Sequence, residues 1–142
     1  MIIVLATGGF DPVHSGHIAY LNHASKLGDI LVVGLNSDDW LTRKKGKPFM
    51  KWDERKAVVK HLEMVDAVID FKDSDDTACG AIDKVRKEFP EHHIVFVNGG
   101  DRTHENIPEM KYNDIEFVFG VGGNEKINSS SKILEEWTNE GS

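Results

Sequence analysis

The sequence predicts an α/β fold in which a doubly wound parallel sheet is flanked by helices in a single domain. The length of 142 residues fits one domain. Short apolar stretches with strand character alternate with segments of helical periodicity, an order typical of right-handed β-α-β crossovers. The first two strand-like stretches are nearly continuous runs of Val, Ile and Leu. Such runs indicate strands buried on both faces, as in a parallel sheet.

Five stretches are expected to form the strands of this sheet. They are Ile2–Leu5, Ile30–Leu35, Ala67–Ile69 with Phe71, Ile94–Val97 and Ile115–Phe119. In doubly wound sheets, ligands bind beyond the carboxyl ends of the strands, near the point where the strand order reverses. The residues directly after the first strand are therefore the first place to look for a site.

Four helices are predicted from apolar residues three and four positions apart. Their expected buried faces are, in chain order, Ile18, Leu21, Ala24, Ser25 and Leu27; Ala57, Val58, His61 and Leu62; Ala78, Ile82, Val85 and Phe89; and Ile133, Leu134 and Trp137. Gly28 is expected to stop the first helix and Pro90 the third. Ser129 or Ser130 is expected to cap the last one, which extends to Trp137.

Composition and charge limit the classes of function. A net charge of −7 argues against a general nucleic-acid-binding protein. The longest apolar run, Met1 to Ala6, is too short for a membrane span, which needs about 20 residues, or for a secretory signal. We therefore expect a cytoplasmic protein without a membrane partner. The single cysteine, Cys79, excludes a disulfide framework within the chain and is expected to be a small buried apolar residue.

The loop after the first strand has the composition of a phosphate-binding loop. Thr7, Gly8 and Gly9 lead toward a helix that starts near Ser15. Adjacent glycines let backbone amides approach a phosphate, and the helix N-terminus adds a favourable partial charge. The spacing matches neither a dinucleotide-binding G-x-G-x-x-G element nor a Walker loop. Taken alone, the glycines are equally compatible with an ordinary tight turn.

His14 and His17 favour the functional interpretation of this loop. Three residues apart at a helix start, they share one face and can point at the same atom. As a cation or as a neutral donor, imidazole can stabilise charge on a phosphoryl group. A zinc site would need a third ligand, and no such motif follows, so we assign no protein metal ligand. Two purely structural histidines are the competing interpretation.

The run from Gly9 to His17, G-F-D-P-V-H-S-G-H, resembles the signature of the cytidylyltransferase-like nucleotidyltransferases. The resemblance implies a Rossmann-like fold and attack by a substrate phosphate on the α-phosphate of CTP or ATP, with release of pyrophosphate. It also implies that His14 and His17 contact the triphosphate and stabilise the transition state. Asp11 is expected to fix the loop, because an anionic phosphate nucleophile requires no strong base.

The densest basic run, residues 43–47, is read as a second part of the same site. Alone, Arg43-Lys44-Lys45-Gly46-Lys47 would be a solvated loop, but in an acidic chain it can hold phosphates electrostatically. The family carries a lysine here, and we assign Lys44, with Lys45 and Lys47 able to share its task. Gly46 is expected to let the loop close over the reactants.

Three later motifs resemble family elements in the family's order. Trp52-Asp53-Glu54-Arg55 resembles the E-x-R element, in which Arg55 would brace a phosphate or the loop around it; an exposed salt bridge is the alternative. Gly99-Gly100-Asp101 resembles the element that lines the nucleotide pocket, and Ser129 to Ser131 resemble the serine element that holds phosphate oxygens. The complete nucleotide-binding assignment is Thr7, Gly8, Gly9, Phe10, Gly16, Arg55, Gly99, Asp101, Ser129, Ser130 and Ser131; the catalytic assignment is His14, His17 and Lys44.

The resemblance leaves the substrates open. The arginine that precedes the serines in glycerol-3-phosphate cytidylyltransferases is absent, although Lys126 could replace it. Asn36-Ser37-Asp38, Lys45-Gly46 and Gly99-Gly100-Asp101 are closer to the heptose-phosphate adenylyltransferases. The expected partners are therefore CTP or ATP with Mg²⁺, and a small phosphorylated sugar or polyol.

Two further questions of function and assembly follow from the resemblance. The family often forms dimers, so a homodimer is compatible with it. A non-catalytic nucleotide-binding module is the alternative function, and the intact His14, His17 and Lys44 argue against it. A dehydrogenase-type dinucleotide-binding protein is excluded by the spacing of the glycines.

Overall fold

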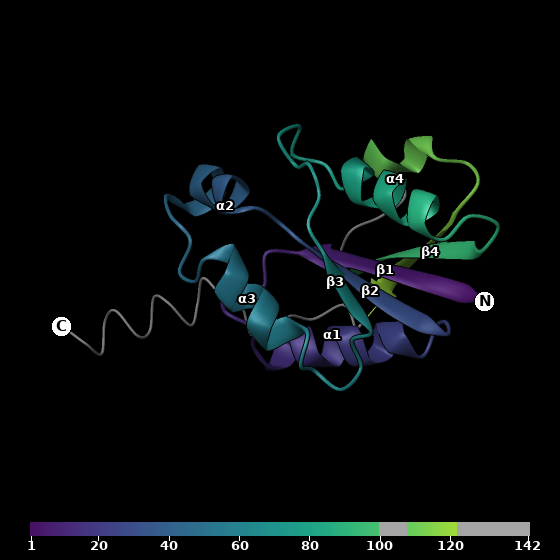
Figure 1. Cartoon of the computed structure of the whole chain (residues 1–142), viewed down its shortest axis with the longest axis horizontal. Coiled ribbons are helices and arrows are strands. Elements are labelled where there is room, and N and C mark those ends of the chain that lie inside the picture. The colour runs from purple at the N-terminus through teal and green to yellow at the C-terminus, as the bar shows by residue number, and fades with distance from the viewer. Residues whose placement is uncertain (100–107, 122–142) are drawn as a thin grey trace.

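The computed structural model describes residues 1–99 and 108–121, which contain a parallel sheet (Figure 1). Its described strands are β1 (Ile2–Gly8), β2 (Ile30–Leu35), β3 (Ala67–Ile69), β4 (His93–Gly99) and β5 (Glu116–Val121). They lie in the order β3-β2-β1-β4-β5, and each neighbouring pair is parallel. The predicted fold class is confirmed, and a strand forms at each of the five predicted places. Strands β1, β4 and β5 extend further toward their carboxyl ends, whereas Phe71, which was included with the third strand, lies outside β3.

The described helices cover both faces of this sheet. They are α1 (Ser15–Ser25), α2 (Asp38–Lys45), α3 (Trp52–Val59), α4 (Cys79–Glu88) and the 3₁₀ turn η1 (Pro108–Lys111). Figure 1 shows α1 and α3 on one side of the sheet and α4 on the other. Within the described ranges, none of these helices has the length and apolarity needed to cross a bilayer.

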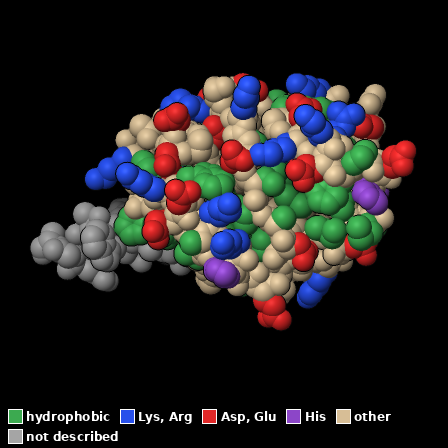
Figure 2. All heavy atoms as spheres, viewed as in Figure 1, with side chains coloured by type: hydrophobic (Ala, Val, Ile, Leu, Met, Phe, Trp, Pro, Cys, Tyr) green, Lys and Arg blue, Asp and Glu red, His purple; other side chains and the backbone are tan. Residues whose placement is uncertain are grey.

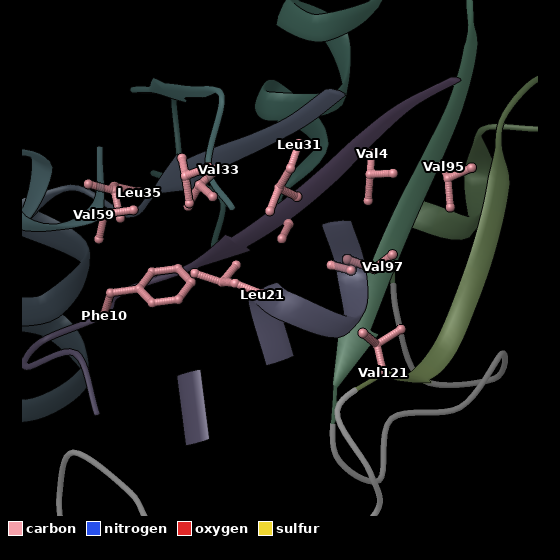
Figure 3. Packing of buried hydrophobic residues seen from close by; sticks show 13 residues of the cluster. Val4, Phe10, Leu21, Leu31, Val33, Leu35, Val59, Val95, Val97 and Val121 are labelled. Atoms are coloured by element: carbon pink, nitrogen blue, oxygen red, sulfur yellow. The ribbon is translucent and has the colours of Figure 1, made fainter. Parts of the chain in front are cut away.

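The core consists of two apolar clusters separated by the sheet. Because successive strand residues point to opposite faces, β1 directs Val4 toward α1 and α3, and Ile3 and Leu5 toward α4. Figure 3 shows the first cluster, in which Leu21 of α1 and Val59 of α3 pack under the strands. Burial of each such side chain stabilises the fold by about 1.5–3 kcal/mol, so the clusters hold the strand ends in a defined position.

The strand order changes direction beside β1. The chain runs from β1 through β2 to β3 on one side, and then crosses to β4 on the other side of β1. The strand order therefore reverses between β1 and β4. Ligands of such sheets bind beyond the carboxyl ends at this point. Here those ends are Gly8 and Gly99.

Helix α2 was not predicted, and the basic run assigned to a loop forms its last turn. Ser37 caps the helix, because its Oγ accepts a hydrogen bond from the Trp40 amide at 3.1 Å. Leu41 is the buried residue of α2, so no apolar periodicity marks this helix in the sequence. Gly46 ends it with φ at 92°, a conformation that favours glycine.

The other helix predictions are partly corrected. Helix α1 ends at Ser25, before Gly28, where glycine is needed because a Cβ would lie 2.9 Å from the Ile2 carbonyl oxygen. For α3 the predicted face is mostly wrong: Ala57, Val58 and His61 are exposed, and Arg55 and Val59 are buried instead. Leu62, just after the helix, does pack against the first core cluster. A buried arginine follows no apolar pattern, so the phase of this helix could not be read from periodicity.

The prediction for α4 is confirmed, with Ile82 and Val85 in the core. Cys79 is buried and unbonded to another cysteine, as expected. The helix predicted from Ser129 to Trp137 lies outside the described residues.

Candidate active site

The loop between β1 and α1 is anchored by an aromatic side chain. Phe10 has φ at 51° and is 3% exposed, and its ring enters the first core cluster beside Leu21 (Figure 3). The ring also contacts His17, with a centroid separation of 4.7 Å. Burial of Phe10 therefore holds the loop and the first turn of α1 in one arrangement.

His14 and His17 cap the N-terminus of α1 reciprocally. Nδ1 of His14 accepts from the Gly16 amide at 3.0 Å, and Nδ1 of His17 accepts from the His14 amide at 3.3 Å. The two rings stack with a centroid separation of 3.8 Å. Because both Nδ1 atoms act as acceptors, each neutral ring carries its proton on Nε2. The pair thus has two Nε2–H donors that these contacts leave unused.

The electrostatics of the pair favour its neutral form. Burial lowers the pKa of His14. Burial, and then the neighbouring His14, lower the pKa of His17 to about 3. The sequence left open whether the imidazoles are cations or neutral donors. For His17 the lowered pKa favours a neutral ring near neutral pH, which can act as a hydrogen-bond donor. Neutral N–H donors beside a helix N-terminus can stabilise anionic oxygen without themselves being charged.

Asp11 fixes the loop, as expected from the sequence. Its side chain is 2% exposed, and its two carboxylate oxygens accept from the amides of Phe49 and Met50, each at 2.6 Å. Nζ of Lys45 lies 2.8 Å from Oδ2 of Asp11 and donates to its carbonyl oxygen at 2.7 Å. Asp11 therefore links the segment after α2 to the histidine loop.

The lysine that reaches this loop is Lys45, whereas Lys44 was assigned from the sequence. Nζ of Lys44 lies 4.7 Å from the centroid of the Trp40 ring, on the exposed side of α2. Lys47 is exposed beyond the end of the helix. Neighbouring residues of an α-helix point about 100° apart, so the two adjacent lysines leave the helix in different directions. A helix that the sequence did not reveal thus decides which lysine is near the histidines.

Arg55 joins the ends of several elements from a fully buried position. Its Nη1 donates to the carbonyl oxygens of Gly9 at 2.9 Å and Asn36 at 2.8 Å, and its Nε donates to the Met50 carbonyl at 3.0 Å. Nη2 pairs with Asp38 at 2.8 Å. Of the roles considered for Arg55, the structure favours bracing the loop, because Nη1 binds the Gly9 carbonyl oxygen. Arg55 does form a salt bridge with Asp38, but the guanidinium is fully buried, so the pair is not an exposed one as in the alternative.

Two buried polar residues near the strand ends, Asp73 and Asn98, were not singled out in the sequence. Asp73 is hydrogen-bonded at 3.1 Å to Asn36, which is also buried and belongs to the Asn36-Ser37-Asp38 run. Asn98, next to the end of β4, is 7% exposed, and its Nδ2 has no hydrogen-bond partner within the described chain. No motif marks Asp73 or Asn98, because their burial depends on contacts between distant segments.

The described part of the predicted site surrounds the carboxyl ends of β1 and β4. Thr7 and Gly8 close β1, Gly9 and Phe10 begin the loop, and Gly99 closes β4. The amide of Gly16 is held by His14. Asp101, Ser129, Ser130 and Ser131 lie outside the described residues, as do Gly100 and Lys126.

The surface and the carboxylates add two observations. On the face in Figure 2, basic and acidic side chains are interspersed, and no broad basic surface is visible. Among residues 1–99 and 108–121, no three His, Cys, Asp or Glu side chains are grouped so that they could hold a metal ion.

Comparisons with known proteins identify the family of the chain. A family model described as cytidylyltransferase-like matches residues 5–117. The chain is 34% identical over 145 residues to "bifunctional protein HldE" of Trichlorobacter lovleyi, and this alignment covers 97% of the chain and 28% of that protein. It is 40% identical over 127 residues to the protein of the same name from Vibrio parahaemolyticus, and this alignment covers 88% of the chain and 24% of that protein. The chain thus spans about a quarter of the length of these relatives.

Solved structures show the same fold. A lipopolysaccharide core biosynthesis protein from Thermoplasma volcanium superimposes with a TM-score of 0.67 at 28% identity, over 90% of this chain and 99% of that one. A bifunctional NMN adenylyltransferase/ADP ribose pyrophosphatase from Francisella tularensis superimposes with a TM-score of 0.70 at 13% identity, over 98% of this chain and 42% of that one. The second similarity concerns the fold alone.

Proposed function

Since the chain belongs to the cytidylyltransferase-like family, we propose that it is a nucleotidyltransferase acting on a small phosphorylated sugar or polyol. In the proposed reaction, a phosphate oxygen of the acceptor attacks the α-phosphorus of CTP or ATP. A new P–O bond forms, the bond to the bridging oxygen of the β-phosphate breaks, and pyrophosphate leaves. The observation that carries this proposal is the stacked His14–His17 pair at the N-terminus of α1, beside the carboxyl end of β1.

The histidine pair supplies the donors that this reaction needs. Negative charge increases on the non-bridging oxygens as the acceptor attacks, and donors already held in place stabilise that charge without reorganising. In this proposal, the Nε2–H groups of His14 and His17 bind those oxygens, because their Nδ1 atoms are occupied by backbone amides. No general base is required, since the acceptor phosphate is already anionic.

We assign the cationic role at the first loop to Lys45, which lies 2.8 Å from Asp11. Its ammonium group would bind a triphosphate oxygen while Asp11 keeps it near the loop. Lys44, on the same helical turn, stays a prediction for the same role. Mg²⁺ is expected to accompany the triphosphate, with phosphate oxygens and water as its main ligands.

The acceptor is proposed to be a sugar phosphate. The similarity of Asn36-Ser37-Asp38 and Lys45-Gly46 to heptose-phosphate adenylyltransferases supports a sugar. The name of the Thermoplasma relative, a lipopolysaccharide core biosynthesis protein, supports saccharide chemistry as well. These similarities favour no particular acceptor, and CMP and AMP remain the two candidate groups for transfer.

A screen of pyrophosphate release tests the proposed function. ATP, CTP, GTP and UTP are each combined with sugar phosphates and polyol phosphates, with and without Mg²⁺. We expect release of pyrophosphate with one triphosphate and one acceptor class, only when both are present, and loss of release when Mg²⁺ is removed. Triphosphate binding without turnover for any acceptor would instead support the non-catalytic nucleotide-binding module.

A further inference from the structure

Asp73 lies in the segment between β3 and α4, and its carboxylate contacts the corner where β2 leads into α2. The side chain is 4% exposed. Its Oδ2 accepts from the Ser37 amide at 2.7 Å and from Nδ2 of Asn36 at 3.1 Å, and its Oδ1 accepts from Oγ of Ser37 at 2.7 Å. A buried carboxylate with three such donors is strongly held, because hydrogen bonds to a charged acceptor are about twice as strong as neutral ones.

These contacts also control the N-terminal cap of α2. The Ser37 hydroxyl has one proton, which it donates to Asp73, so its lone pairs remain available to the Trp40 amide at 3.1 Å. The carboxylate therefore orients the group that caps the helix. A cap of this kind is important for a helix of only eight residues, because so short a helix is marginally stable by itself.

The backbone of residue 73 also holds the other end of α2. Nη2 of Arg43, in the last turn, donates to the Asp73 carbonyl oxygen at 2.8 Å. The same guanidinium pairs with Asp76 at 3.0 Å, but both of those side chains are largely exposed. An exposed pair contributes little, so the hydrogen bonds of the less exposed Asp73 carboxylate are the stronger connection to α2.

The position of α2 determines the position of Lys45. Lys45 is the last residue of the helix, and its Nζ contacts the carboxylate and the carbonyl oxygen of Asp11. Leu41 is the residue of α2 in the core, so few apolar contacts orient the helix. A rotation or shift of this two-turn helix would move Lys45 away from the histidine loop.

We propose that Asp73 is a positioning residue, which holds α2 so that Lys45 stays against the loop of His14 and His17. The effect on turnover rests on the proposed nucleotidyl transfer, whereas the anchoring of α2 does not. Asp73 touches no reacting atom in this proposal; it acts through Ser37, α2 and Lys45.

The first test measures the anchoring without any substrate. Asp73→Asn keeps the shape of the side chain, but it removes the negative charge and replaces one carboxylate oxygen by an NH₂ group. That group would face the donors of Asn36 and Ser37, from which it cannot accept a hydrogen bond. Hydrogen exchange of the α2 amides is expected to become about tenfold faster, because local opening of the helix is easier. Ser37→Ala removes the same contact from the other partner and should have a similar effect. Unchanged exchange of α2 in both variants would overturn the proposal.

Asp76→Asn is the matched control. It removes the exposed ion pair with Arg43 and leaves the contacts of residue 73 in place. Asp76 has φ at 61°, a conformation that asparagine also tolerates well. Exchange of α2 and turnover should therefore stay within about twofold of the wild type. An effect as large as that of Asp73→Asn would assign the anchoring to the surface pair instead.

The second test asks whether Asp73 acts through Lys45. Turnover at saturating substrates is expected to fall about tenfold in Asp73→Asn, but less than about twofold when the same change is made in a Lys45→Met background. Equal losses in the two backgrounds, or normal turnover despite faster exchange of α2, would contradict the positioning role. If the wild type releases no pyrophosphate at all, the proposed function fails, and the exchange experiment still decides whether Asp73 anchors the helix.

Discussion

At the residue scale, the proposed chemistry depends on which ring atoms of His14 and His17 remain available. Backbone amides occupy Nδ1 of both rings, which leaves the Nε2–H groups as donors. Burial keeps His17 neutral near physiological pH. A neutral donor binds an anionic oxygen without the large desolvation cost of a buried cation, so the same environment that lowers the pKa suits the proposed role.

We predict that His17→Ala lowers the rate of pyrophosphate release by about 100-fold or more, as expected for loss of a donor to the transition state. The fold should remain, because Phe10 and the core residues of α1 still anchor the loop. Turnover measured with the active substrate pair checks this, together with circular dichroism for folding. His61→Ala, at an exposed position after α3, is the control and should retain activity. Normal release in His17→Ala would refute the assignment.

The lowered pKa of His17 also predicts a pH dependence of stability. Its pKa falls from the ordinary 6.5 to about 3 in the folded state. Between these values the unfolded chain binds a proton that the folded chain does not, so the free energy of unfolding decreases as pH falls from about 6.5. The limit for one proton is about 1.4 kcal/mol per pH unit.

Urea unfolding of the wild type and His17→Gln between about pH 7 and pH 5 checks this. The variant lacks the titrating ring, so its free energy of unfolding should decrease less steeply toward acid. Parallel curves for the two proteins would show that His17 is not held neutral by the fold.

At the element scale, the site depends on connections between the ends of secondary-structure elements. Arg55 of α3 donates to the backbone carbonyl oxygens of Gly9, Asn36 and Met50, the first two of which follow β1 and β2. Asp11 accepts from the amides of residues 49 and 50. These contacts hold the segment between α2 and α3 against the histidine loop. Arg55 serves this purpose because its planar guanidinium has five donors in a fixed geometry.

We predict that Arg55→Met lowers the free energy of unfolding by about 3 kcal/mol or more, because it leaves three carbonyl oxygens without their donor. Chemical denaturation of the two proteins measures the change. Glu54→Gln, at an exposed position of the same helix, should change the stability by less than about 1 kcal/mol. A loss in Arg55→Met as small as that of the control would mean that the buried contacts contribute little.

At the scale of the whole molecule, the order β3-β2-β1-β4-β5 brings distant segments to one edge of the sheet. The histidine loop follows β1, the Arg55 carbonyl partners follow β1 and β2, and Gly99 closes β4. Parallel strands place all of these carboxyl ends on the same side, so residues as far apart in the chain as Gly8 and Gly99 can surround one ligand. In sheets of this kind, ligands bind where the strand order reverses, which here is beside β1.

The sequence by itself determined the fold class, the five strands and the place of the histidine pair. These follow from local patterns: continuous Val, Ile and Leu runs predict buried parallel strands, and the Gly9–His17 run is recognised within nine consecutive residues. Only the tertiary structure decided that Lys45 reaches the loop, that Arg55 is buried and that Asp73 contacts α2. Those features depend on the phase of short helices and on contacts between segments far apart in the chain, which apolar periodicity does not encode.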